Sequence, residues 1–186
     1  IANKSRDIPT RRQAGPRPYQ RKNLALKQDR TSPKEMNNYT VLEEAVKEAE
    51  TTTFRDGSWR TEPVSVIVTA YNSEKNLRKT LQALAEQTYP SELIEVVIAD
   101  DGGSDNSQAL VEGLNLQFPV RYVWQQDNEY RLSRSRNNGL KNATHDKIIV
   151  IDNDIIVDTK FVETYMKWHH VADQSATDLL LVGRRQ

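Results

Sequence analysis

The sequence predicts an α/β protein built on one mostly parallel sheet with flanking helices. From residue 64 onward, apolar runs of strand length alternate with segments of helical periodicity. This order implies parallel strands joined by right-handed crossovers. Two of the apolar runs end in acidic clusters, Asp100-Asp101-Gly102-Gly103 and Asp152-Asn153-Asp154. Because the carboxyl ends of parallel strands form the ligand crevice of such a sheet, we expect both clusters around one pocket.

Five strands are expected. The first, Val64–Ala70, is β-branched and nearly all apolar, as befits a strand that is covered on both faces. The others are Leu93–Ala99, Val120–Trp124, Lys147–Ile151 and, last, Leu179–Val182.

Helical periodicity fills the gaps between these strands. Ser73 is placed to cap a helix in which Leu77, Leu81 and Leu84 form an i, i+4, i+7 stripe. Further helices are expected over 106–114, 131–143 and 159–170. Three aromatic residues at patterned positions are expected to pack inside: Trp124, Phe161 and Trp168.

The chain divides into three parts. Residues 1–34 form an arm with ten Lys or Arg, two Asp and four Pro, residues 35–62 an amphipathic helix and polar connector, and residues 63–186 the α/β domain. The arm is interpreted as a solvated tail or linker, and contact with membrane headgroups or another polyanion is the alternative. Nucleic acid is not expected as a partner, because the arm has one aromatic residue, Tyr19, and no recognisable binding module.

Composition limits the class of protein. With 186 residues, 37% hydrophobic and 28% charged, the chain suits one globular core. No run approaches the ~20 apolar residues of a membrane span, and no signal-peptide pattern opens the chain. The absence of cysteine excludes disulfides, thiolate metal sites and cysteine nucleophiles. We expect a cytoplasmic protein, and its placement at the inner face of the membrane through the arm is the alternative.

The turn after the first strand excludes several cofactor classes. Residues 69–74, TAYNSE, contain no glycine, whereas NAD, FAD and P-loop sites need a glycine-rich turn at this place. A phosphatase-type domain with an aspartate nucleophile is disfavoured as well, because its acid usually stands at the end of the first strand.

The acidic clusters carry the chemistry. Asp152 and Asp154, at i and i+2 of an extended segment, point the same way and can address one divalent cation, or a cation and a ribose hydroxyl. A carboxylate of the first cluster can accept a hydrogen bond from an imide N–H such as that of uracil, with a simple turn and N-cap as the alternative. Arg131, Arg134 and Arg136 are expected to neutralise phosphate oxygens, or else to form a solvated basic face. The three histidines are assigned no role.

Four motifs in order resemble the nucleotide-binding half of a family 2, GT-A fold (Rossmann-like) glycosyltransferase. They are VSVIVTAYNS (64–73), VVIADDGGSD (96–105), RNNGL (136–140) and IVIDNDIIVD (149–158). The segments DNEYRLSRSRNNGL and LLLVGRRQ are similar to bacterial chondroitin and hyaluronan polymerases, particularly to their N-acetylgalactosamine-transferring domain.

The resemblance implies a role for each matching position. Ala70, Tyr71, Asn72 and Glu74 would lie around the uridine, and Asp100 or Asp101 would read the uracil edge. Arg136 would face the diphosphate or ribose, and Asp152 and Asn153 the ribose or sugar. Asp154, together with Asp152, would hold Mn²⁺ or Mg²⁺.

The implied reaction is a metal-dependent, inverting transfer of a hexose or N-acetylhexosamine from a UDP-sugar to a hydroxyl of a glycan or other acceptor, as in polysaccharide biosynthesis. The general base is expected beyond residue 186, so the chain would be the donor-binding portion of a longer enzyme. The alternative is a sugar-nucleotide-binding or interaction module that lacks the acceptor half and transfers nothing.

Overall fold

The structure is a computed structural model that describes residues 38–175 and residue 180. Its described part contains a four-stranded sheet in the order β3-β2-β1-β4, and every neighbouring pair is parallel. The strands are β1 (Val64–Ala70), β2 (Ile94–Asp100), β3 (Val120–Trp124) and β4 (Lys147–Asp152). The predicted parallel sheet is therefore confirmed. The predicted fifth strand falls, except for Leu180, outside the described residues.

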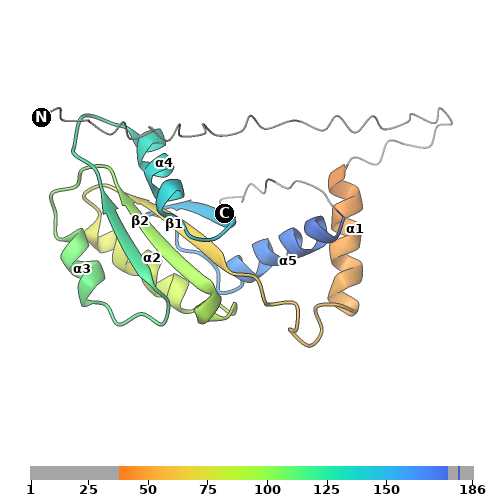
Figure 1. Ribbon diagram of the computed structural model, residues 1–186. Helices are drawn as coiled ribbons and strands as arrows, with labels where there is room; N and C mark the ends of the chain where they lie inside the picture. Colours follow the sequence, from red (N-terminus) through yellow and green to blue (C-terminus); the bar gives the residue numbers. More distant parts are fainter. Residues whose placement is uncertain (1–37, 176–179, 181–186) are drawn as a thin grey trace, which may run out of the picture. The chain divides into compact units, whose positions relative to one another are not determined.

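Helices cover both faces of the sheet. Figure 1 shows α2 (Glu74–Ala85) and α3 (Ser107–Gly113) on one side and α4 (Leu132–Asn142) on the other. A short 3-10 turn, η1 (Ser91–Leu93), precedes β2. The remaining helices, α1 (Asn38–Thr51) and α5 (Phe161–Gln174), pack against each other. In residues 38–175 no helix has both the length and the apolar character needed to cross a membrane.

The two faces of the sheet differ in how much apolar surface they bury. The face toward α2 belongs to the main core, with fully buried side chains such as Val66, Val96 and Leu81. The α4 face has a small cluster in which only Ile67, Val97 and Ala99 are buried, with Val123 and Ile148 at its margin. Burial of apolar area therefore stabilises the α4 layer much less than the α2 layer.

Helix α4 lies with its backbone close to the sheet. Within α4, whose residues are all described, the buried ones are Ser135 and Gly139. A Cβ atom added at Gly139 would lie 2.5 Å from Cγ2 of Ile67, and the Ser135 hydroxyl donates to the carbonyl of Ala99 at 2.7 Å. Small residues thus permit a close approach, but they supply little hydrophobic stabilisation.

The segment before β1 is more than a connector. Leu42 and Val46 of α1 are buried, which confirms the amphipathic helix. The following residues are predicted as a polar connector, but Phe54 and Trp59 are buried there with ring centroids 4.8 Å apart. The segment joins α1 to β1 without helix or strand, and these two aromatic side chains attach it to the core. The prediction for Trp124 is wrong, since the side chain is 51% exposed, while Phe161 and Trp168 pack partly buried against the core.

Candidate functional site

A cavity of about 680 Å³ opens at the carboxyl edge of the sheet, and both acidic turns line it. Asp101 comes from the end of β2 and Asp154 from the turn after β4. The expected convergence of two segments some fifty residues apart is present. The lining residues are Thr69, Ala70, Tyr71, Asp101, Asp127, Glu129, Tyr130, Leu132, Asp152, Asn153 and Asp154.

The neighbouring aspartates of the first turn have different surroundings. Asp100 is buried, accepts the backbone N–H of Gly103 at 2.6 Å and also accepts the hydroxyl of Tyr122. Burial and the hydrogen bond to Asp100 both raise the pKa of Tyr122, so this tyrosine keeps its proton and remains a donor. Asp100 therefore stabilises the turn from inside and is not among the residues that line the cavity.

Asp101 faces the cavity while it also makes internal contacts. Its carboxylate accepts the side-chain amide of Gln125 and the backbone N–H of Arg131, the latter at 2.8 Å. A carboxylate offers about four lone-pair positions, so two internal donors leave capacity for a third from a ligand. Of the two aspartates that the sequence could not separate, the geometry favours Asp101 as the one that meets a ligand.

A loop over residues 125–131 crosses the glycine turn and completes the cavity wall. Gly102 has φ +98°, and a Cβ added there would collide with the backbone of Asp127, so glycine is needed for both conformation and space. The indole N–H of Trp124 donates to the carbonyl of Gly103 at 3.1 Å. The Tyr71 hydroxyl donates to Asp127 at 3.3 Å, and the charge of Asp127 raises the pKa of Tyr71.

Sequence reasoning missed the residues that this loop contributes, Asp127, Glu129 and Tyr130, and also Leu132 at the start of α4. A signal was available, because they follow β3 and therefore reach the same carboxyl edge as the two acidic clusters. Tyr130 is 85% exposed in the lining, an unusual position for a large aromatic side chain.

The second acidic turn is held by a dense set of hydrogen bonds. One oxygen of Asp152 accepts the Thr69 hydroxyl at 2.8 Å and the Arg136 guanidinium at 2.9 Å. The Asn153 amide donates to the Ser73 hydroxyl. Ser73 precedes α2 as its N-cap residue but makes no capping hydrogen bond with its side chain, so the predicted cap is replaced by a contact with the acidic turn.

The residues present fit a divalent cation held partly by a ligand. Across the described residues no three His, Cys, Asp or Glu gather into a complete metal site. Mg²⁺ in nucleotide sites usually takes one or two protein carboxylates and completes its shell with phosphate oxygens and water, and Mn²⁺ suits the same oxygen ligands. Asp154 and Asp152, side by side in the cavity lining, provide that number.

Two of the predicted nucleotide-binding residues lie elsewhere. Asn72 and Glu74 line a neighbouring cavity of about 760 Å³ at the start of α2. The side-chain oxygen of Asn72 accepts the N–H groups of Ser104 and Asp105 at 2.7 and 3.2 Å, and so ties the glycine turn to β1. The structure does not bring these two residues into the main cavity, and their contact with a nucleotide stays a prediction.

The three arginines of the predicted basic cluster are also separated. Arg136 reaches Asp152, whereas the Arg131 guanidinium donates to the carbonyl of Gln126. Arg131 and Arg134 line a third cavity of about 400 Å³ on the outer side of the 125–131 loop. Of the three guanidinium groups, that of Arg136 pairs with a residue of the main cavity lining, Asp152, although Arg136 is not itself among the lining residues.

A parallel sheet whose acidic turns at the ends of β2 and β4 line one cavity places the chain among the α/β proteins with a cavity at the carboxyl edge of the sheet. The chain belongs to glycosyl transferase family 2, whose family model matches residues 65–178. Its sheet is that of the GT-A fold, shared with the glycosyltransferases described next.

Named relatives support this membership. The chain is 31% identical over 106 residues to validoxylamine A glucosyltransferase of Streptomyces hygroscopicus subsp. limoneus, covering 57% of this chain and 23% of the relative. It is 32% identical over 123 residues to chondroitin synthase of Escherichia coli, covering 66% and 17%. The crystal structure of S. aureus TarS 1-349 in complex with UDP-GlcNAc matches with a TM-score of 0.51 and 29% identity, covering 55% and 29%. The chain thus spans about a quarter or less of the length of these curated relatives.

Proposed function

We propose that the chain is the donor-binding part of a glycosyltransferase that moves a hexose or N-acetylhexosamine from a UDP-sugar to an acceptor hydroxyl. The proposal includes a divalent cation at Asp154 and inversion at the anomeric carbon. TarS is similar to the described domain and has been crystallised with UDP and with UDP-GlcNAc, which supports a UDP-linked N-acetylhexosamine as the donor.

The observation that carries the proposal is that Asp101 and Asp154 line one cavity. Asp101 is then placed to accept the imide N–H of uracil, next to Ala70 and Tyr71 at the end of β1. Asp154, in the turn after β4, lines the same cavity. A uridine diphosphate needs these two kinds of contact at its two ends.

The charge of the cavity explains why a cation belongs to the proposal. In the described part of the chain, five carboxylates line the cavity: Asp101, Asp127, Glu129, Asp152 and Asp154. No lysine or arginine is among these lining residues. Arg136, which is not among the lining residues, pairs with Asp152 at 2.9 Å. A diphosphate entering alone would meet like charges in a partly desolvated space, so its binding should require a divalent ion.

The proposed reaction conserves atoms and charge. The acceptor oxygen attacks the anomeric carbon in line with the bond to the β-phosphate, that bond breaks with its electron pair passing to UDP, and the hydroxyl proton passes to a base. When bound, the cation would stabilise the charge that develops on the diphosphate. In this proposal Asp101 and the end of β1 orient the nucleotide, and the Arg136 guanidinium holds Asp152 in place through their contact at 2.9 Å.

The test is a calorimetric titration of the chain with UDP, UDP-GlcNAc, UDP-GalNAc, ADP and GDP, each with Mn²⁺ and with excess chelator. We expect binding of the uridine nucleotides in Mn²⁺ and at least a tenfold loss in chelator, or roughly 1.4 kcal/mol. Equal affinity for ADP and GDP would contradict the base assignment, and equal affinity in chelator would contradict the cation. An assay for transfer of labelled sugar to an acceptor separates the enzyme from a binding module, which would bind the same nucleotides and transfer nothing.

A further inference from the structure

Two buried carboxylates on the same face of β2 hold the two ends of α4. Just after the carboxyl end of β2, Asp101 accepts the backbone N–H of Arg131, the N-cap residue of α4, at 2.8 Å. Near the amino end of β2, Glu95 accepts the backbone N–H of Thr144, just after the last residue of α4, at 3.0 Å. Six residues of extended chain separate the two acids, which places them roughly 20 Å apart. Only Asp101 belongs to the nucleotide site, so Glu95 needs another explanation.

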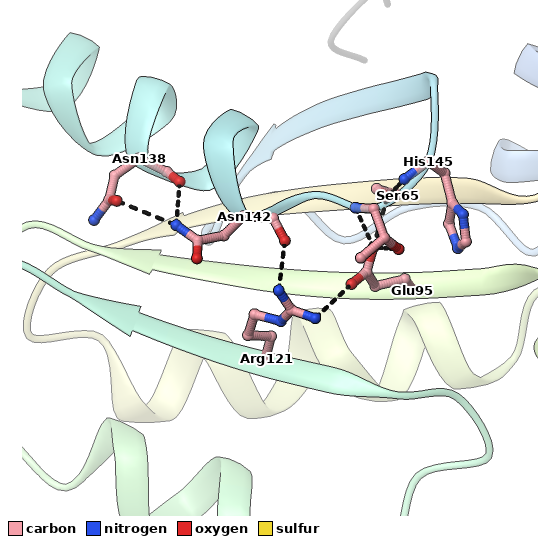
Figure 2. A network of polar contacts seen from close by, with 7 residues as sticks. Ser65, Glu95, Arg121, Asn138, Asn142 and His145 are labelled. Carbon is pink, nitrogen blue, oxygen red and sulfur yellow. Dashed lines mark hydrogen bonds and ion pairs between the residues drawn. The ribbon is translucent and has the colours of Figure 1, made fainter. Parts of the chain in front are cut away.

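Glu95, itself buried, is the centre of a polar network (Figure 2). Its Oε2 accepts the hydroxyls of Ser65 and Thr144, both at 2.7 Å, in addition to the Thr144 N–H. The Ser65 hydroxyl oxygen in turn accepts the backbone N–H of His145 at 3.2 Å. The turn between α4 and β4 is thereby attached to the first residues of β1 and β2.

Arg121 makes this network compatible with the helix end. A carboxylate beside a helix C-terminus meets the negative end of the helix dipole, which is unfavourable. Arg121 reaches from β3 and donates to the carbonyl of Asn142, the last residue of α4, at 3.1 Å, and its guanidinium lies 3.7 Å from Oε1 of Glu95 (Figure 2). One cation thus satisfies a terminal carbonyl and offsets the charge of Glu95.

The position of α4 depends on such contacts because its apolar packing is slight. Its buried residues are Ser135 and Gly139, over the small cluster of Ile67, Val97 and Ala99. The same helix carries Arg136, which must hold a distance of 2.9 Å to Asp152. A small shift or rotation of α4 would therefore break the Arg136–Asp152 pair before it cost much buried area.

We propose that Glu95 is a positioning residue for the nucleotide site, because it fixes α4 at the amino edge of the sheet and so keeps Arg136 on Asp152 at the carboxyl edge. This inference rests on the proposed function for its ligand, UDP with Mn²⁺. Glu95 would thus support the nucleotide site although it lies about 20 Å from Asp101.

The test compares Glu95→Gln with Glu163→Gln in the full chain. Glu163 is a matched control: it is also buried, accepts the Thr88 hydroxyl and pairs with Arg60 and Lys167, but it belongs to α5. We expect both variants to lower the urea midpoint. Only Glu95→Gln should weaken binding of UDP with Mn²⁺, by about tenfold, as for a misplaced binding group. Unchanged affinity of a folded Glu95→Gln protein would overturn the proposal.

A double-variant cycle tests the route through Arg136. If Glu95 acts by placing that guanidinium, Glu95→Gln should cause no further loss of UDP affinity in an Arg136→Met background. Two independent, additive losses would refute this route. Should Glu95→Gln fail to fold, Thr144→Val removes a single donor and should give a smaller loss of affinity in the same direction.

Hydrogen exchange tests the positioning of α4 by Glu95 without a ligand, and so independently of the proposed function. Amides of 132–142 should exchange faster in Glu95→Gln than in the unmodified chain, while those of α2 stay protected. If the unmodified chain binds no UDP, the proposed function fails, but faster exchange in α4 would still support the positioning of that helix. Unchanged exchange in α4 would overturn it whatever the ligand.

Discussion

The carboxylate of Asp101 accepts the backbone N–H of Arg131 at 2.8 Å, so the acid that faces the cavity also fixes the residue at which α4 begins. Its other oxygen accepts the Gln125 amide, at the start of the loop that forms the cavity wall. Under the proposed function, one side chain would both recognise the ligand and place two structural elements.

This arrangement predicts different effects for the two neighbouring aspartates. Asp101→Asn should lower UDP affinity by about tenfold or more, because a charged acceptor is lost at the base. Asp100→Asn should lower the free energy of unfolding by about 1–3 kcal/mol, because a buried acceptor of Gly103 and Tyr122 is lost. Titration calorimetry and urea denaturation on both variants check the pair, and a larger affinity loss for Asp100→Asn would reverse the assignment.

Asp154→Asn should remove the effect of Mn²⁺ on UDP binding and leave the fold intact. The amide lacks the charge that a hard divalent cation prefers in its ligands, so affinity in Mn²⁺ should drop to the level measured in chelator. Asp146→Asn is the control, since Asp146 is an exposed acid just before β4, at the opposite end of the same strand. A Mn²⁺ effect that persists in Asp154→Asn would place the cation elsewhere.

Two helical glycines should respond oppositely to alanine. At Gly139 the new Cβ would meet Ile67 at 2.5 Å and Ala99 at 3.2 Å, and overpacking of this kind costs about 1–3 kcal/mol. At Gly113 a Cβ meets no atom within 4 Å, so the better helix propensity of alanine should raise stability by about 0.5–1 kcal/mol. Urea denaturation measures both, and a neutral Gly139→Ala would show that α4 is free to move away from the sheet.

Acid should destabilise the domain through its buried glutamates. Burial by itself would raise the pKa of Glu95, but hydrogen bonds from Thr144 and Ser65 and the ion pair with Arg121 outweigh it and lower the pKa below 4.5. A group whose pKa is lower in the folded state stabilises the fold above its unfolded value, and this contribution is lost as the pH falls through the folded value. We therefore expect the free energy of unfolding to decrease below about pH 4.5.

Urea denaturation between pH 6 and about pH 3 measures this slope, and Glu95→Gln should flatten it. Glu163 should contribute in the same direction, since its hydrogen bond from Thr88 and its pairs with Arg60 and Lys167 lower its pKa against the effect of burial. Stability that rises on acidification would contradict the expected sign.

Removal of residues 1–34 should leave UDP affinity unchanged. The residues that line the main cavity all fall between Thr69 and Asp154 in the sequence. The ten basic residues of the arm should instead favour anionic membranes. Co-sedimentation with vesicles of phosphatidylglycerol, compared with phosphatidylcholine, tests that proposal. A large loss of UDP affinity in the shortened chain would make the arm part of the site.

The strands could be predicted from sequence because burial on two faces requires continuous apolar runs. The predicted bounds of β1 and β3 match the structure, those of β2 are shifted by one residue at both ends, and those of β4 differ by one residue at the carboxyl end. The cap at Ser73 could not be predicted, because its partner Asn153 lies eighty residues away and competes for the same hydroxyl. A short sequence pattern predicts contacts between neighbouring residues, whereas the Ser73–Asn153 contact is set by the tertiary fold.

The site was partly predictable for a related reason. The acidic turns after β2 and β4 stand out as short polar interruptions of apolar runs, and topology brings them together. The loop that carries Asp127 and Tyr130 has no regular pattern, and its course depends on Gly102, which leaves room for its backbone. Likewise, the network of Glu95 looks in sequence like one charged residue inside a strand.

The hydroxyl of Thr80, buried on α2, donates to the carbonyl of Asn153 at 2.7 Å and lies 3.3 Å from that of Ile155. The turn that carries Asp152 and Asp154 is therefore ordered when the protein folds. A nucleotide that binds there would not have to order this turn, so binding would not include that loss of conformational entropy. Under the proposed function, nucleotide affinity would thus depend on Thr80, which is not among the residues that line the main cavity. A family member with another residue in place of Thr80 would then bind the donor more weakly.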